Sequence, residues 1–212
     1  MQPGAVPETA TASPYLAASA RVGIRHYVYE DGEEFTTLAG RSTGHHRPWL
    51  FPPLTAEAYA AYARRLIEDP ARAGFLVCRR AYAAYARRLI EDPARAGFLV
   101  CRRESGRIAG FININNIVEG GFRSGALGYG AFAPAVGHGL MGEGLGLVVR
   151  YAFGPMRLHR LEANIQPGNA ASIALVSRAG FRLEGFSPDF LFIDGAWRDH
   201  ERWAITSEML DR

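Results

Sequence analysis

Lysine is missing from this chain, and all 24 of its basic residues are arginine. Several enzyme classes depend on a lysine amine, and its absence excludes each of them. They include enzymes that form a Schiff base through lysine, enzymes with a lysine general base, and nucleotide-binding proteins with a Walker-type lysine. The chemistry of this chain must therefore use other side chains or backbone groups.

Cysteine and long apolar runs are also scarce. Cys78 and Cys101 occupy equivalent positions in two identical segments, so they imply neither a disulfide framework nor a metal cluster. No apolar run reaches the roughly 18 residues of a membrane-spanning helix. The first residues lack the basic and leucine-rich regions of a signal peptide. We expect residues 1–18, which are rich in Pro, Ala, Thr and Ser, to form a disordered lead, and the protein to be cytoplasmic.

A perfect tandem duplication interrupts the chain, because residues 58–80 and residues 81–103 are identical. Each copy predicts a helix followed by a short strand. Thr55 can cap the helix of the first copy, and the strand of the second copy leads into a hairpin. We therefore expect the first helix and the second strand to take the native places, within a single domain at 19–212 that contains one surplus copy. The intervening stretch could form a second helix on the surface.

The duplication also accounts for the positive net charge of +3. One copy carries five arginines and two acids, so a chain with a single copy would be neutral. The basic balance is therefore a weak argument for nucleic acid as a partner, and we expect no direct nucleic-acid binding.

Periodicity and turn residues predict an alternation of strands and helices in the rest of the chain. In the strand at 108–117, Ile112 and Ile114 alternate with Asn113 and Asn115, which suggests one wet or functional face. The other expected strands are 20–29, 98–103, 126–132, 157–165, 181–193 and 197–206, and the other expected helices are 31–42, 140–153 and 169–180, with 43–53 as a loop.

A glycine-rich loop, "PAVGHGLMGEG" at 134–144, precedes the helix expected at 140–153. The first N–H groups of a helix have no partner within it, and the helix dipole adds a partial positive charge there. Glycines allow a phosphate to approach this backbone closely. The loop is therefore an expected anion site, and a pyrophosphate is a natural ligand.

Two coenzymes could use such a loop. The spacing of Gly137, Gly139 and Gly142 matches a dinucleotide fingerprint, and Glu162 follows at the expected distance. A dinucleotide fold, however, places this motif after its first strand and follows it with several strand–helix units. Here four strands precede the loop and only one helix follows the next strand. This order argues against a dinucleotide and leaves coenzyme A as the alternative.

The chain resembles the GNAT acetyltransferases, and within them the RimJ-type ribosomal-protein-alanine N-acetyltransferases. The resemblance covers roughly 105–206 and depends on motifs in a specific order: "LGYGAF", "GHGLMGEGL", "RYAF", "PGNAAS", "RAGF" and "DGAWRDH". The loop pattern of the family usually opens with Gln or Arg, whereas this chain has Pro134. One side chain that would face the phosphates is therefore missing.

The resemblance implies an α+β fold with a central, mixed but mostly antiparallel sheet that splays in a V and is flanked by helices. It implies transfer of an acetyl group from acetyl-CoA to a primary amine, with the N-terminal amine of a ribosomal or other protein as the expected acceptor. A small-molecule amine such as an amino acid or an aminoglycoside, or a non-catalytic coenzyme-binding role, stays open. We expect a monomer or homodimer without a membrane partner.

The same resemblance implies which residues bind the coenzyme. The strand at 127–133 would offer backbone groups to the pantetheine arm, and the loop would bind the pyrophosphate through N–H groups. Asn169 and Ser172 would lie near the thioester. The expected coenzyme-binding residues are Phe132, Ala133, Val136, Gly137, His138, Gly139, Leu140, Met141, Asn169 and Ser172.

Ser172 is the expected proton donor to the leaving thiolate, with a capping or surface serine as the alternative. Related enzymes often use a Glu on the strand and a Tyr on the helix, where this chain has Asn164 and Val176. Glu162, which shares a strand face with Asn164, and Asp189 are therefore candidate bases. Ion pairing with Arg160 or Arg182 is the alternative for each acid. An α-amine with a pKa near 8 is already partly neutral and needs little help.

The acceptor is expected to contact Trp49, Tyr129, Asn164 and Phe190. His200 reads as a structural residue that could line the acceptor pocket, and His138 as a solvated loop residue that could approach a phosphate. His45 and His46 have no partners at metal-ligand spacing, so no metal site is expected.

Overall fold

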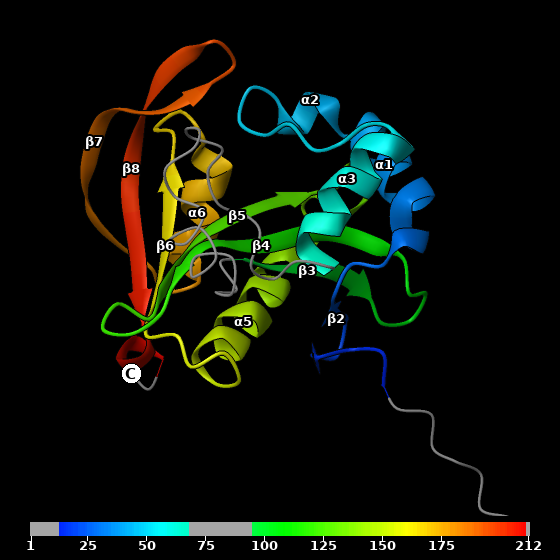
Figure 1. The fold of residues 1–212 in the computed structure, drawn as a ribbon, viewed down its shortest axis with the longest axis horizontal. Helices are drawn as coiled ribbons and strands as arrows, with labels where there is room; N and C mark the ends of the chain where they lie inside the picture. The colour runs from blue at the N-terminus through cyan, green and yellow to red at the C-terminus, as the bar shows by residue number, and fades with distance from the viewer. Residues whose placement is uncertain (1–12, 68–94, 211–212) are drawn as a thin grey trace, which may run out of the picture.

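The computed structural model describes residues 13–67 and 95–210, which form one eight-stranded sheet with helices on both faces (Figure 1). The spatial order of the strands is β1-β2-β3-β4-β5-β6-β8-β7. No helix in these two ranges is long and apolar enough to cross a membrane. The strands are β1 (Ala17–Ala18), β2 (Val22–Arg25), β3 (Ala96–Arg102), β4 (Ile108–Val118), β5 (Ser124–Ala131), β6 (Arg160–Ile165), β7 (Arg182–Ile193) and β8 (Ala196–Thr206).

The sheet is antiparallel except between β5 and β6. These two strands pair in parallel over Ser124–Leu127 and Arg160–Ala163 only. Beyond Leu127, β5 continues along β4, while beyond Ala163, β6 continues along β8. The two halves of the sheet therefore separate at this point, and the expected V-shaped splay in a mixed, mostly antiparallel sheet is confirmed.

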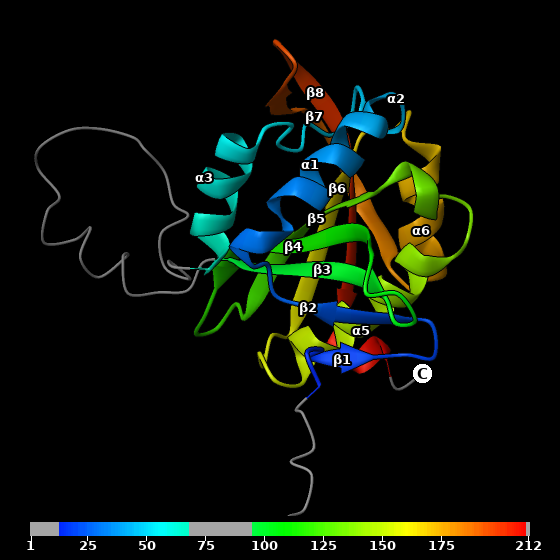
Figure 2. The same cartoon turned by 90° about the vertical axis from the view of Figure 1, so that its right-hand side faces the viewer.

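Helices cover the sheet from both sides (Figure 2). On one face, α1 (Gly32–Arg41) and α3 (Ala56–Ile67) enclose an aromatic cluster around Phe35 and Tyr59. On the other face, α5 (Leu140–Phe153) and α6 (Ala170–Arg178) form the larger core. Along β3, Phe98 and Val100 belong to the larger core and the alternate residues to the aromatic cluster, as the period of two in a strand requires.

The predicted use of the duplicated segments agrees with the structure. The helix α3 comes from the first copy, and Thr55 caps it by accepting a hydrogen bond from the Ala58 N–H at 3.2 Å. The strand β3 comes from the second copy and pairs with both β2 and β4. The stretch at 68–94, where a second helix was expected, lies outside the described residues, as does the lead up to residue 12.

Two local expectations need correction. The ordered chain begins before residue 19, because Ala17 and Ala18 pair with β2 as strand β1. In β4, Asn113 is buried rather than wet, since the aromatic cluster covers its face of the sheet. Its side chain accepts a hydrogen bond from the Tyr27 hydroxyl at 3.2 Å and donates one to the Tyr62 hydroxyl at 2.5 Å. A buried amide without such partners would destabilise the fold.

The segment expected as a loop at 43–53 begins with a short helix, α2 (Thr43–His46), which follows α1 in the chain and contacts the end of β5. The Ser42 hydroxyl accepts a hydrogen bond from the Ala133 N–H at 2.8 Å. His46 is buried, and its Nε2 lies 2.7 Å from the Ala131 carbonyl oxygen. Burial lowers the pKa of His46 more than this hydrogen bond raises it, so the imidazole is neutral and donates from Nε2.

Candidate active site

A cavity of about 860 Å³ opens at the splay of β5 and β6. One end is formed by the glycine loop and the first turn of α5, and one wall by α6. The other end is lined by residues that follow α1 and by the C-terminal hairpin of β7 and β8. The volume falls within the range of small-molecule sites, roughly 300–1,000 Å³.

The glycine loop has the conformation of an anion cradle. Gly137 and Gly139 adopt the left-handed region, with φ of 80° and 75°, and Gly139 is the N-cap of α5. A side chain would be strained at either position, which explains why both are glycine. The expected loop residues Val136, Gly137, Gly139 and Met141 all line the cavity. The loop therefore presents the N-terminus of α5 to the cavity, which suits a phosphate group.

Other expected coenzyme-binding residues have different surroundings. His138 is exposed and Leu140 is buried in the core, and neither side chain lines the cavity. Phe132 is buried in the aromatic cluster, and its N–H donates to the Ala109 carbonyl at 2.9 Å. The Ala133 N–H is held by Ser42. The N–H groups of Phe132 and Ala133 therefore already have partners within the chain and are not available to a coenzyme.

The alternation of the β5 backbone identifies which N–H groups face the splay. Successive N–H groups of a strand point to opposite edges. Since the Phe132 N–H points to β4, those of Ala131 and Tyr129 point toward the opening between β5 and β6. The bond from His46 to the Ala131 carbonyl, on the same edge, agrees with this direction. Pairing with β6 ends at Leu127, so these two N–H groups are available to a ligand.

Ser172 and Tyr129 meet at this opening. The Asn169 side chain caps α6 by accepting a hydrogen bond from the Ser172 N–H at 3.1 Å. The Ser172 hydroxyl is free of that cap and lies 2.6 Å from the Tyr129 hydroxyl. Burial raises the pKa of Tyr129, partly offset by this bond, to about 12. Tyr129 therefore stays protonated and can donate to Ser172, which leaves the serine O–H directed elsewhere.

Neither candidate base lines the cavity. Glu162 accepts hydrogen bonds from Arg160 Nε at 2.9 Å and from an Arg202 guanidinium nitrogen at 3.0 Å. Burial alone would raise its pKa, but these two bonds outweigh burial and lower it. A carboxylate with a lowered pKa is a poor proton acceptor. The ion-pair alternative therefore describes Glu162 in this structure.

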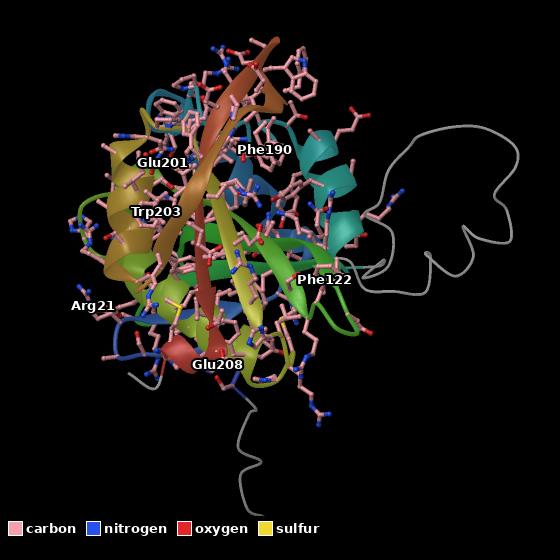
Figure 3. All side chains as sticks on the ribbon, turned by 90° about the vertical axis from the view of Figure 1, so that its left-hand side faces the viewer. Arg21, Phe122, Phe190, Glu201, Trp203 and Glu208 are labelled. Carbon is pink, nitrogen blue, oxygen red and sulfur yellow. The ribbon has the colours of Figure 1, made fainter. Side chains whose placement is uncertain are left out.

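Asp189 and Phe190 lie in an exposed part of β7. Asp189 is exposed, and its N–H donates to Asp199 at 2.9 Å. The Phe190 ring packs edge-on against His200, with ring centroids 5.7 Å apart, and lies under the Arg202 guanidinium. Figure 3 shows Phe190 on the C-terminal hairpin, away from the N-terminal strands and Arg21. Phe190 thus supports a lining residue, His200, without lining the cavity itself.

The remaining acceptor candidates line the cavity. Trp49 and Asn164 both contribute to its wall, as does His200, whose Nδ1 lies 2.9 Å from the Arg198 carbonyl. Asn164 Oδ1 is buried and makes no hydrogen bond with the described part of the chain. Within that part, no cluster of His, Cys, Asp and Glu side chains could hold a metal ion.

Sequence reasoning missed two features of this site. Tyr129, an expected acceptor contact, lines the cavity, and its hydroxyl partner is Ser172, which is 43 residues away. Arg21, from the turn before β2, lines the cavity beside the glycine loop. The sequence around these residues indicates neither contact, because each depends on how strands and helices that are distant in the chain are brought together.

The family model described as "Acetyltransferase (GNAT) domain" matches residues 21–182. A [ribosomal protein uS5]-alanine N-acetyltransferase of Escherichia coli (strain K12) is 42% identical over 100 residues, which are 47% of this chain and 52% of that protein. The match thus spans about half the length of that relative.

Solved structures give a similar result over more of the chain. The structure of Mycobacterium smegmatis RimJ in complex with CoA-disulfide superposes with a TM-score of 0.73 and 27% identity, over 90% of this chain and 84% of that one. A ribosomal-protein-S5-alanine acetyltransferase of Vibrio fischeri superposes with a TM-score of 0.71 and 22% identity, over 91% and 96%. The second likeness shows the fold.

Proposed function

Because the chain belongs to the GNAT acetyltransferase family, we propose that it transfers the acetyl group of acetyl-CoA to the N-terminal α-amine of a protein, such as a ribosomal protein. The observation that carries the proposal is the cavity at the splay, which joins a glycine cradle to the Tyr129–Ser172 pair. The relatives named above, with activity on the alanine terminus of a ribosomal protein, support the choice of acceptor.

The cavity fits the coenzyme in three respects. The loop offers the N-terminus of α5 to a pyrophosphate, and its glycines leave room for close approach. The exposed edge of β5 offers N–H groups to an extended arm, as an added strand would require. The cavity volume of about 860 Å³ is sufficient for a coenzyme arm and an acceptor terminus.

Bound acetyl-CoA would supply a thioester, whose carbonyl carbon an amine can attack. The Tyr129 and Ala131 N–H groups face the opening and would stabilise negative charge on the thioester oxygen. Tyr129 can donate to Ser172, and the serine O–H would then give its proton to the departing thiolate while the serine oxygen takes the proton that the attacking amine loses. Asn164 Oδ1, which lacks a partner in the described ranges, would orient the acceptor amine by accepting its N–H.

No dedicated base is required for an N-terminal amine. An α-amino group has a pKa of about 7.7–8.0, so a useful fraction is neutral near pH 7.5. A lysine ε-amine, with a pKa near 10.4, would require strong assistance. Glu162 is held in its ion pairs and Asp189 is exposed, so the site favours the more acidic α-amine.

The cavity disfavours a polycationic small molecule such as an aminoglycoside. Among the described residues that line it, Glu143 is the sole acid, and it lies at the glycine loop. The acceptor end is lined by Trp49, Leu50, Gln166, Leu191 and histidines. A ligand with several ammonium groups would leave charges unpaired in such a pocket. Incubation with a library of N-terminal peptides and with aminoglycosides, followed by mass spectrometry, tests the choice, and exclusive aminoglycoside acetylation would refute it.

The role of Ser172 is tested by Ser172→Ala. Since the Asn169 cap uses the Ser172 backbone N–H, the variant keeps the cap and loses only the hydroxyl. We expect kcat to fall at least tenfold, an effect typical of losing a proton donor, with the Kd for acetyl-CoA unchanged. Ser177→Ala, an exposed serine on the same helix, is the matched control and should keep full activity.

Tyr129→Phe provides a second measurement on the same pair. It removes the hydroxyl that bonds to Ser172 and should lower kcat by a smaller factor, because the serine can take a donor from water instead. Unchanged turnover in Ser172→Ala would remove the serine from the mechanism.

A further inference from the structure

The glycine loop has no strongly basic side chain of its own. Its opening position is Pro134, and His138 is its one basic residue. His138 is exposed and does not line the cavity. Backbone N–H groups and the dipole of α5 supply only partial positive charge, whereas a pyrophosphate carries full negative charges. A cation for this end of the cavity must therefore come from another part of the chain.

Arg21 reaches the loop from the turn between β1 and β2. Its guanidinium donates to the His138 carbonyl at 3.2 Å and, through Nε, to Glu143 at 2.6 Å. It lines the cavity beside Gly137, Gly139 and Gly142. A Cβ built on Gly139 would lie 3.4 Å from one of its nitrogens, so the guanidinium lies close to this glycine. Figure 3 shows Arg21 on the side of the molecule where the N-terminal strands and α5 lie.

The guanidinium retains donors for a ligand. An arginine has five N–H donors, and Arg21 uses Nε and one terminal nitrogen for Glu143 and the other terminal nitrogen for His138. Each terminal nitrogen carries a second N–H. The Arg21 side chain is 55% exposed, so these remaining donors are accessible from the cavity.

Glu143 places a negative charge beside the glycine loop, which Arg21 neutralises. This carboxylate lies in the first turn of α5 and lines the same cavity, where it would repel a pyrophosphate. Hydrogen bonds from Ser19, at 2.7 Å, and from Arg21 hold it. Arg21 therefore neutralises an adverse charge at the cradle, and Glu143 in return fixes the guanidinium over the loop.

We propose that Arg21 is a coenzyme-binding residue that donates to a pyrophosphate oxygen of acetyl-CoA and supplies the cation that Pro134 does not. The inference rests on the proposed function, since it assumes that the coenzyme occupies the cavity. It places part of the phosphate site in the turn between β1 and β2, outside the glycine loop and more than a hundred residues before it.

The test compares ligands with and without phosphates. Arg21→Ala should weaken binding of acetyl-CoA at least tenfold by calorimetry, and should leave the KM for acetyl-pantetheine, which has no phosphate, within about twofold of the original protein. Acetyl-dephospho-CoA, which keeps the pyrophosphate, should lose as much affinity as acetyl-CoA. Arg107→Ala is the matched control, because Arg107 is also an exposed arginine beside one glutamate but does not line the cavity.

Two further variants separate charge from structural support. Arg21→Gln keeps donors for Glu143 and the His138 carbonyl but removes the charge, and it should weaken acetyl-CoA binding to the same degree. In Arg21→Ala combined with Glu143→Gln, removal of the repelling carboxylate should restore binding several-fold relative to Arg21→Ala alone.

The inference fails if Arg21→Ala binds acetyl-CoA as well as the original protein, or if acetyl-pantetheine is weakened equally, which would indicate a structural role. A loss confined to acetyl-CoA and absent with acetyl-dephospho-CoA would overturn the pyrophosphate assignment. If the original protein binds neither acetyl-CoA nor acetyl-pantetheine, the proposed function fails first, and this inference falls with it.

Discussion

Removing one copy of the duplication should stabilise the protein. Because residues 58–80 and 81–103 are identical, deleting either copy gives the same shortened chain. In that chain, every side chain of α3 and β3 that packs in the core is still present, including the equivalents of Tyr59, Ala63, Phe98 and Val100. The deletion therefore changes the length of the connection between α3 and β3 and leaves the packed elements intact.

The magnitude follows from the length of that connection. Between Ile67, where α3 ends, and Ala96, where β3 begins, lie roughly 28 residues, and the deletion would leave about five, a reduction of about 2.5 doublings. At about 0.6 kcal/mol for each doubling, the free energy of unfolding should rise by about 1.5 kcal/mol. For a chain of this size, the Tm should increase by about 3–6 °C.

The assay is chemical denaturation followed by circular dichroism, with the KM for acetyl-CoA measured in parallel. Neither α3 nor β3 lines the cavity, so the KM should not change. A length control replaces 68–90 by an equally long Gly/Ser segment and should keep the original stability to within about 0.5 kcal/mol. A deletion protein that is less stable, insoluble or inactive would refute the view that one copy is surplus.

Two other predictions concern the helices on the aromatic face. Asp31→Ala should lower the free energy of unfolding by about 3 kcal/mol, because Asp31 is buried, pairs with Arg25 at 2.7 and 2.5 Å, and accepts the Val28 N–H at 3.0 Å. The exposed Glu33→Ala should change it by less than about 0.5 kcal/mol, and a loss below about 1 kcal/mol in Asp31→Ala would contradict the importance of the pair. Burial lowers the pKa of His46 in the folded state, so on acidification the unfolded chain takes up a proton at a higher pH than the folded protein does. The free energy of unfolding should therefore fall as the pH drops from about 6.5 toward the folded pKa. His46→Gln should show a flatter decline over that window in denaturation at several pH values, and identical slopes would argue against a neutral buried His46.

The elements of the fold could be predicted wherever a local pattern determines them. The helix expected at 140–153 is α5 at the same bounds, because a stripe of apolar residues follows a glycine N-cap. The helix expected at 169–180 is α6 at Ala170–Arg178, and Asn169 caps it. Asp194 and Gly195 both adopt positive φ, of 51° and 77°, as a tight hairpin between β7 and β8 requires.

Side-chain partners were harder to predict than elements. The alternation along β4 correctly separated Asn113 from its isoleucine neighbours, but it could not reveal what covers that face. The answer depends on Tyr27 and Tyr62, which lie 86 and 51 residues away in sequence. A strand pattern reports how two faces differ, and only packing decides whether the polar face meets water or hydroxyl groups.

In the cavity, the strand β5 also shows the difference between what the sequence pattern predicts and what packing decides. The resemblance assigns the whole segment 127–133 to the coenzyme, yet successive N–H groups of a strand cannot face the same edge. In the structure, the Phe132 N–H donates to β4 and the Ala133 N–H donates to Ser42. The N–H groups of Tyr129 and Ala131 point toward the opening instead. The sequence alone predicts that the N–H groups of this strand alternate between its two edges. Only the hydrogen bond from the Phe132 N–H to the Ala109 carbonyl shows which N–H groups point to which edge. A glycine loop and a strand can thus be recognised from the chain alone, whereas the groups that would hold the coenzyme follow from which neighbour each strand edge has already bound.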